Sequence, residues 1–411
     1  MNTASHQHKT VTLWLCGILH AFTHLYTTAL VPLYLLIQKD FRLSGEGQAA
    51  LLVTVQTAAY VLPSYWMGVL ADKYSRKTIM AAGLILNGLA FIALAFAPSY
   101  GWAMFCLVIA GIGGSFYHPA AMAMVARSFP ANPGHAFGRV GIGAGVGFFV
   151  GPVYTGWRAT TAGWRSPLWE LGLLGVLAAL AFYWFAQVET AEAVPKHEQA
   201  VRDTWKFETH WLWLFLGVCM AFSLRDFAGG GMSTLSSLFL QRAWGYDPAW
   251  AGIALGSLSL MAIISNPLFG SLSDRNREGS IRTVLFIAAS LAALMPWLPR
   301  QFLLPALLAY GFFFMASFPM VEAALMSAVP DPVRGRVMGF LVMFCGGASS
   351  ISHWIMGESV KGLGLRAATP RAFAPLYATL GFMIIGALLG LRGLRALRRC
   401  SPLPAQSKAN L

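Results

Sequence analysis

Three charged residues lie inside long apolar stretches of the sequence: Arg225, Asp226 and Glu322. Charged side chains at bilayer depth are costly and usually mark functional sites. Arg225 could attract an anionic group and Asp226 could orient that group or carry a proton, while a buried carboxyl such as Glu322 could exchange a proton near neutral pH. A structural role, as an interhelical ion pair or a hydrogen-bonded carboxyl, is the alternative for each. Because adjacent helical positions do not face each other, we expect that Arg225 and Asp226 do not simply neutralise one another.

Uncharged polar residues within apolar stretches are further candidates for substrate binding or coupling. His20 and His24 are four residues apart, so they share a helix face, and two imidazoles at that spacing could bind a metal ion. No third ligand is identifiable from the sequence, so the favoured interpretation is a pair of cavity-lining histidines without a metal. His118 is expected to be a hydrogen-bonding cavity residue. Gln56 and Tyr60 share another helix face, from which Tyr60 could line the mouth of the cavity.

Membrane helices must position these residues, because the composition excludes a soluble protein. Of the 411 residues, 57% are hydrophobic and only 11% are charged, whereas a soluble domain carries about 25% charged residues. Only helices or closed barrels span lipid, and runs of about 20 apolar residues favour helices. The sequence predicts twelve spans, near residues 11–37, 47–70, 78–97, 102–126, 138–157, 167–187, 211–240, 248–270, 283–299, 302–328, 337–357 and 371–392.

The twelve spans are expected to form two halves of six. The predicted organisation is an N-terminal half at 1–188, a cytoplasmic linker at 189–210, a C-terminal half at 211–393 and a cytoplasmic tail at 394–411. The halves repeat, because Gly17 matches Gly217 and Pro130 matches Pro330 in the same order of spans. Parallel repeats of this kind place a substrate site between the halves near the bilayer midplane.

The net charge of +13 would suggest a nucleic-acid partner in a soluble protein. Here Lys and Arg are about twice as frequent in the loops on the side of the termini, and the positive-inside rule then places both termini in the cytoplasm. We therefore expect an integral cell membrane protein of the bacterial inner-membrane type. Its partners are the lipid bilayer and a small molecule, with no nucleic acid, and no cofactor is implied.

A charged loop follows the second span. Residues 68–77 read GVLADKYSRK, which resembles the signature of the major facilitator superfamily between its second and third helices, apart from a serine at one glycine position. The resemblance implies that Gly68 allows close helix approach and that Asp72, Arg76 and Lys77 form a conformational latch on the cytoplasmic face. A degraded copy at 270–275 retains Asp274.

A glycine-rich element lies in the fifth span. Residues 147–156 read GFFVGPVYTG, which resembles the Gly-Pro element of antiporters in the same superfamily; Gly147, Gly151, Pro152 and Gly156 are its helix-packing positions. General packing through glycine is the alternative. The arginine that many proton antiporters carry in span 4 is Val108 here, so proton coupling by that residue is not implied.

The sequence of span 4 at 111–119, GIGGSFYHP, together with the His20–His24 segment, resembles the fosmidomycin-resistance branch of the superfamily. The implied fold is an all-α membrane protein of two pseudo-symmetric six-helix bundles. The implied function is secondary active transport, as proton-coupled export of a small polar or anionic compound such as a drug, by a monomer. The alternative is a proton symporter that imports an organic anion or another small metabolite. A receptor or channel is a less favoured alternative, and no enzyme is expected.

Overall fold

The computed structural model describes residues 3–129, 133–187, 209–273, 276–329 and 334–400. Every regular element in these ranges is a helix, which confirms the predicted all-α fold. Within the same ranges, eleven helical stretches are long and apolar enough to cross a membrane. The remaining predicted span folds as two shorter helices, α3 and α4, separated at Pro63, because proline lacks the backbone N–H that would continue the helix.

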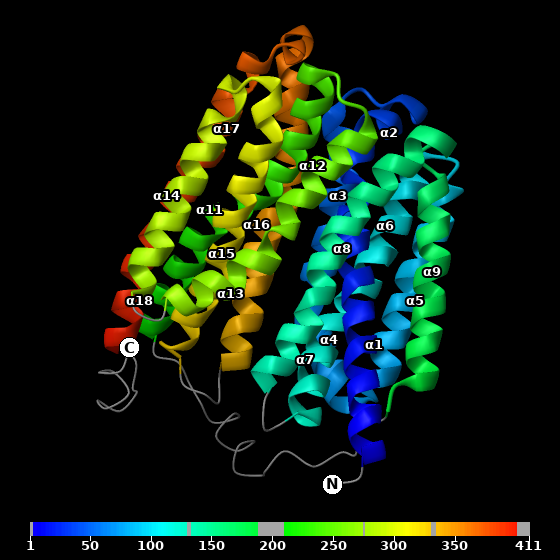
Figure 1. Ribbon diagram of the computed structural model, residues 1–411, viewed down its shortest axis with the longest axis vertical. Helices are drawn as coiled ribbons and strands as arrows, with labels where there is room; N and C mark the ends of the chain where they lie inside the picture. The colour runs from blue at the N-terminus through cyan, green and yellow to red at the C-terminus, as the bar shows by residue number, and fades with distance from the viewer. Residues whose placement is uncertain (1–2, 130–132, 188–208, 274–275, 330–333, 401–411) are drawn as a thin grey trace.

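The helices gather into two bundles that lie side by side (Figure 1). The first bundle contains α1 (Thr3–Thr28), the 3-10 turn η1 (Val31–Leu33), α2 (Tyr34–Asp40), α3 (Glu46–Val61), α4 (Ser64–Lys73), α5 (Arg76–Ala95), α6 (Tyr100–Ser115), α7 (Tyr117–Ser128), α8 (Pro133–Ala162) and α9 (Ser166–Phe185). The second bundle contains α11 (Thr209–Trp244), α12 (Pro248–Leu260), α13 (Ala262–Ser273), α14 (Arg277–Leu294), α15 (Leu303–Met326), α16 (Arg334–Leu363), α17 (Ala374–Gly386) and α18 (Leu389–Cys400), with the 3-10 turns η2 (Met295–Trp297), η3 (Arg300–Phe302), η5 (Gly364–Ala368) and η6 (Pro370–Phe373). The predicted linker at 189–210 lies almost entirely outside the described residues.

The two bundles approach each other at the end remote from the chain termini and diverge toward the termini (Figure 1). Hydrogen bonds and an ion pair join them at the remote end. The Tyr34 hydroxyl lies 3.0 Å from Thr234 Oγ1, and Arg242 Nη1 lies 3.3 Å from Glu46 Oε1. Ser237 donates to the Val31 carbonyl at 2.7 Å. These contacts hold the halves together on one side of the molecule.

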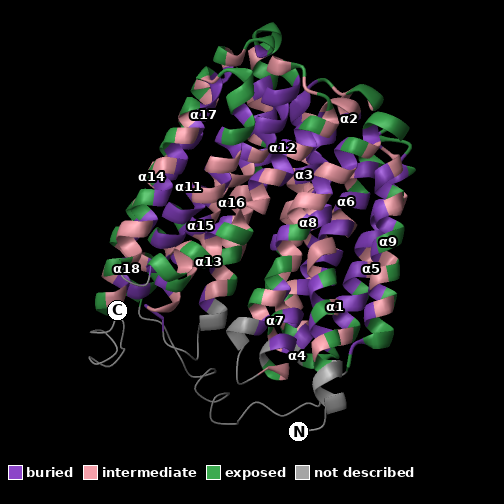
Figure 2. Ribbon diagram, in the orientation of Figure 1, coloured by how far each residue is buried: buried purple, intermediate pink, exposed green. Residues whose placement is uncertain are grey.

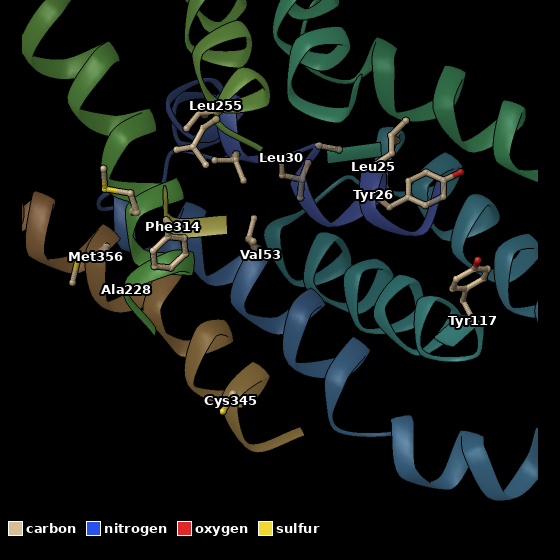
Figure 3. Packing of buried hydrophobic residues seen from close by; sticks show 14 of the residues in the cluster. Leu25, Tyr26, Leu30, Val53, Tyr117, Ala228, Leu255, Phe314, Cys345 and Met356 are labelled. Carbon is tan, nitrogen blue, oxygen red and sulfur yellow. The ribbon is translucent and has the colours of Figure 1, made fainter. Parts of the chain in front are cut away.

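Apolar side chains from both halves share one buried cluster. Leu30 and Val53 of the first half belong to the same cluster as Leu255 and Phe314 of the second (Figure 3). Exposed positions follow the outer surfaces of the helices, where a membrane protein meets lipid tails (Figure 2). Large apolar side chains such as Trp184 and Phe382 are more than two-thirds exposed on that surface, at 74% and 77%. This distribution is expected where the solvent is lipid.

Candidate functional site

The buried Arg225 is the centre of a charged cluster in the second half. Its side chain is only 3% exposed. Arg225 Nε donates to Asp226 Oδ1 at 2.7 Å, and Nη1 donates to the Ser317 carbonyl of α15 at 3.3 Å. The guanidinium also lies over the Phe318 ring at 4.0 Å, a favourable arrangement for a desolvated cation. The neighbouring helix α15 therefore fixes the guanidinium in place.

The expectation that the adjacent side chains of Arg225 and Asp226 do not face each other is wrong in this structure. The two residues are adjacent on α11, yet they form a direct ion pair. The rule on helix faces concerns side chains that extend along their Cα–Cβ directions. The long arginine side chain bends back toward its neighbour, so the pair forms within one helix. Asp226 remains 13% exposed and is the more accessible partner.

Glu322 lies on α15, the helix whose Ser317 carbonyl accepts a hydrogen bond from Arg225. It is half-buried and lies within electrostatic reach of both Arg225 and Asp226. The structure therefore brings together all three charged residues that the sequence singled out. Cys345 of α16 joins the cluster, since it lies within electrostatic reach of Asp226 and Arg225. Ser223 donates to its Sγ at 3.6 Å, and Figure 3 shows this cysteine on α16. Sequence reasoning missed Cys345, because a cysteine in an apolar run carries no distinguishing signal.

The three glycines after Asp226 do not break the helix. The sequence predicts a loosened span at residues 229–231, but α11 continues from Thr209 to Trp244 without interruption. A Cβ at Gly230 would lie 2.7 Å from the Ser349 carbonyl of α16, too close for any side chain. The glycines therefore allow close packing of α11 on α16, and the helix is not broken beside Arg225.

A histidine cluster occupies the first half. His20 and His24 of α1 meet His118 of α7, and the three ring centroids lie 4.8 to 5.3 Å apart. His20 Nδ1 lies 2.9 Å from the Val140 carbonyl, and its Nε2 lies 3.1 Å from His24 Nε2. All three residues are half-buried. The sequence identified each of these histidines but not their assembly, because that depends on how α7 packs against α1.

Gln56 and Tyr60 of α3 take different positions. Gln56 is 1% exposed and donates to the Tyr26 carbonyl at 3.0 Å, which is a contact internal to the first half. The Tyr60 ring lies against the histidines, with centroids 6.5 Å from His24 and 6.1 Å from His118. Tyr60 thus belongs to the histidine cluster, whereas Gln56 bonds to the backbone of α1 at Tyr26.

The predicted latch is only partly described. Asp274 and the side chain of Asp72 lie outside the described residues. Lys77 donates to the Ala186 carbonyl at 2.6 Å, and Arg76 is buried at the start of α5. A Cβ on Gly68 would lie 3.6 Å from Pro119, an ordinary contact, so close packing does not require glycine there.

The glycine-rich element of α8 packs on both halves. A Cβ at Gly147 or Gly151 would meet backbone carbonyls of α1, at Ala21 and Leu25 respectively. A Cβ at Gly156 would meet the Pro248 carbonyl of α12, in the other half. Reciprocally, a Cβ at Gly252 would meet the carbonyl of Pro152. One helix therefore carries glycine contacts to its own bundle and to the opposite one.

A chain of hydrogen bonds that was not predicted from the sequence connects the two halves. Thr234 Oγ1 lies 2.7 Å from His353 Nδ1 and 3.0 Å from the Tyr34 hydroxyl, so Thr234 links a tyrosine of the first half to a histidine of the second. Thr234 is fully buried. Nothing in the spacing of these residues indicates that α2 contacts α11, so the sequence offers no signal for this contact.

Two helical bundles that span a membrane, with charged and polar clusters buried inside each, define a membrane transporter. The sequence model of the Major Facilitator Superfamily matches residues 13–353. The chain belongs to that superfamily, and it is accordingly a transporter of small molecules and not an enzyme.

Known proteins with similar sequences and structures include efflux and metabolite transporters. The chain is 25% identical over 306 residues to the multi-drug resistance efflux pump PmrA of Streptococcus pneumoniae, covering 72% of this chain and 75% of the pump. It is 27% identical over 399 residues to the protein described as "Probable sulfoacetate transporter SauU" of Cupriavidus necator, covering 88% and 87%. The inward-facing, unoccupied crystal structure of a bacterial homologue of the human lysosomal transporter Spinster superposes with a TM-score of 0.78 at 16% identity, covering 96% of this chain and 98% of that one. The last likeness concerns the fold alone.

Proposed function

We propose that this transporter exports a small polar or anionic compound, such as a drug, in exchange for protons by alternating access. It acts as a monomer in a bacterial inner membrane with both termini in the cytoplasm. The observation that carries the proposal is the buried cluster of Arg225, Asp226 and Glu322, which places one cation and two carboxylates at the core of the second half. Such groups inside a membrane protein serve substrate or proton pathways.

Two roles can be assigned within the charged cluster: one residue binds the substrate, and another couples its transport to proton movement. Asp226 and Ser317 use Nε and Nη1 of Arg225, and guanidinium carries five N–H donors. The remaining donors are available to an anionic group of the substrate. Glu322 shares the field of Arg225 without being its direct ion-pair partner, so its charge can change while the Arg225–Asp226 pair persists. We therefore assign substrate attraction to Arg225 and proton exchange to Glu322.

The arrangement of the halves fits one state of an alternating-access cycle. The hydrogen bonds and ion pair between the halves lie at the end remote from the termini. If the termini are cytoplasmic, as the distribution of basic residues predicts, this state is closed to the outside and open to the cytoplasm. An exporter would load its substrate in that state.

The second candidate is import of an organic anion together with a proton. The likeness to SauU over 88% of this chain favours it, since the name of that relative refers to the transport of an organic anion. The likeness to PmrA, named as an efflux pump, favours export. The glycine-rich element in α8 also resembles antiporters, and for these two reasons we place export first.

One experiment separates export, import and uncoupled transport. The purified protein is reconstituted into vesicles that contain a pH-sensitive dye, and candidate compounds are added outside. In an antiporter, a compound that enters the vesicle drives protons out; in a symporter, it carries protons in. Vesicles without protein give the background. The export proposal fails if every transported compound acidifies the vesicle lumen, and proton coupling fails if transport leaves luminal pH unchanged.

Replacing Glu322 tests the coupling role. We expect Glu322→Gln to abolish transport driven by a pH gradient, while exchange of labelled for unlabelled compound continues, because the amide cannot release a proton. Asp40→Asn, at an exposed carboxylate 2.8 Å from Arg165, is the control and should retain full coupling. A Glu322→Gln variant that still responds fully to the pH gradient would exclude this residue as the proton carrier.

A further inference from the structure

Three imidazoles from two helices converge in the first half. His20 and His24 lie one turn apart on α1, and His118 lies near the start of α7. One ligand-capable nitrogen of each ring lies within 4.8 Å of the other two, and the Nε2 atoms of His20 and His24 are 3.1 Å apart. A tetrahedral zinc ion holds nitrogen ligands at about 2.0–2.1 Å, which places them roughly 3.3 Å from each other. The two α1 histidines already have nearly this spacing, and the third requires a shift of at most about 1.5 Å.

The surroundings of His20 orient it as a ligand. Its Nδ1 lies 2.9 Å from the Val140 carbonyl of α8, and a carbonyl can only accept, so Nδ1 carries the hydrogen and Nε2 presents its lone pair to the cluster. Tyr117 stacks on the same ring with centroids 4.9 Å apart, and its hydroxyl donates to the Cys16 carbonyl at 2.8 Å. Metal-binding histidines usually donate the N–H of their other ring nitrogen to a carbonyl or carboxylate, as His20 does here.

The histidine cluster borders a cavity, and a buried tyrosine hydroxyl lies beside it. His20 and His118 line a cavity of about 50 Å³ between α1, α7 and α8, and all three histidines are half-buried, not sealed. Tyr60 lies against His24 and His118, and its buried hydroxyl has no hydrogen-bond partner among the described residues. A buried hydroxyl without a partner calls for an explanation, and a polar ligand bound beside its ring would supply one.

We propose that His20, His24 and His118 bind one divalent transition-metal ion of the zinc type. Neutral imidazole suits Zn²⁺, Ni²⁺ and Cu²⁺, whereas Mg²⁺ and Ca²⁺ require oxygen ligands that the cluster does not offer. Three histidines complete all but one position of a tetrahedral ion, and the fourth is open to water or to an anionic group. This site is independent of the charged cluster around Arg225, so the inference does not rest on the proposed drug export.

The competing explanation is a hydrogen bond between neutral histidines. His24 Nε2 could donate to His20 Nε2 at 3.1 Å and satisfy both atoms without an ion. That explanation leaves His118 and the Tyr60 hydroxyl without a role in the cluster. It predicts no stoichiometric metal and no loss of metal affinity when His118 is replaced, which makes the two explanations separable by experiment.

The test uses the full-length protein, purified in detergent without a polyhistidine tag and stripped with a chelator. We expect Zn²⁺ titration by calorimetry to give one ion per chain, and Co²⁺ to give the intense visible absorption of a tetrahedral site. His20→Gln, His24→Gln and His118→Phe should each weaken Zn²⁺ affinity at least tenfold. The chain contains six further histidines, at positions 6, 8, 135, 197, 210 and 353. The variant His6→Gln/His8→Gln/His135→Gln/His197→Gln/His210→Gln is the matched control and should retain wild-type affinity; His353 is kept because it contacts Thr234.

Measurements on the unmodified protein keep the test decisive if a variant fails to fold. X-ray absorption at the zinc edge of the wild type should give three nitrogen ligands at about 2.0 Å. Binding that disappears in the control variant, or that survives in all three cluster variants, overturns the proposal. Radioactive zinc in the vesicle assay then distinguishes the sources of the ion: accumulation identifies transported cargo, and tight binding without accumulation identifies a resident ion.

Discussion

At the scale of single residues, Arg225 is the position where a substitution should change substrate binding most. Its guanidinium is desolvated, paired to Asp226 at 2.7 Å and supported by the Phe318 ring. We expect Arg225→Ala to weaken binding of an anionic substrate at least about tenfold, because breaking a buried pair leaves Asp226 unpaired as well as removing the cation. Equilibrium binding of labelled compound to the purified protein measures the effect.

A matched arginine substitution completes this test. Arg158 also forms a close ion pair, 2.8 Å from Glu170, but it lies 30% exposed at the far end of α8. Arg158→Ala should leave substrate affinity within about twofold of wild type, since Arg158 and Glu170 lie in the first half, away from the cluster around Arg225. Equal affinity in the Arg225→Ala and wild-type proteins would remove Arg225 from the substrate site.

The sequence identified the charged residues of the second half for a clear physical reason. Only 11% of the chain is charged, so Arg225, Asp226 and Glu322 are conspicuous within apolar spans. The direct Arg225–Asp226 pair was not predictable, because it depends on side-chain conformation and not on position along the helix. The grouping of His118 with the α1 histidines likewise depends on tertiary packing of α7 against α1.

At the scale of helices, the contact of α2 with α11 should control the closed end of the transporter. Removing the Thr234 hydroxyl with Thr234→Val breaks buried hydrogen bonds to both Tyr34 and His353. We expect the population closed at this end to fall by roughly fivefold, since a buried hydrogen bond contributes about 1 kcal/mol net. Distances between spin labels on the two halves, placed at the remote end, report that population.

Tyr377→Phe is the matched control for this contact. Tyr377 is also fully buried and donates to Ser236 at 3.2 Å, but both residues belong to the second half. Its loss should lower thermal stability without changing the distance distribution between the halves. An unchanged distribution in Thr234→Val would show that the Tyr34–Thr234–His353 chain does not hold the closed end.

The glycine contacts between α8 and α12 make a second prediction at this scale. A methyl group at Gly252 would meet the Pro152 carbonyl of the other half, so we expect Gly252→Ala to separate α12 from α8 and to slow transport severalfold. Gly217→Ala on α11 is the control, because nothing lies within 4 Å of a Cβ there. The transport rate in vesicles and the thermal stability of both variants check the prediction, and equal rates would contradict it.

The behaviour of individual helices was only partly predictable from residue types. Pro63 divides the second span into α3 and α4, where the missing N–H favours an interruption, whereas α8 continues through Pro152. Residues 229–231 were expected to loosen α11, yet close packing on α16 keeps that helix continuous. Glycine in a membrane helix favours flexibility or close packing according to its neighbour, and only the folded arrangement identifies the neighbour of Gly230.

At the scale of the whole molecule, hydropathy was sufficient to predict the helical architecture, because the bilayer leaves a chain few ways to satisfy its backbone. The end at which the halves join was not predictable. It is determined by contacts such as Tyr34 with Thr234, between residues far apart in the sequence. Alternating access requires the two halves to adopt more than one relative arrangement, so the same sequence must be compatible with each of those arrangements.

The ion pair between Glu46 and Arg242 tests how the two halves depend on each other. Glu46 begins α3 with a side chain only 5% exposed, and Arg242 lies near the end of α11 in the other half. We expect Glu46→Arg to place two cations together and to shift the molecule away from the state closed at this end, measured by the same inter-half distances. The exchanged pair Glu46→Arg/Arg242→Glu should restore the wild-type distribution, because a cation at position 46 then attracts an anion at position 242. If the double variant behaves like the single one, the residues act separately, and the hydrogen bonds, apolar contacts and glycine contacts hold the two halves together without this ion pair.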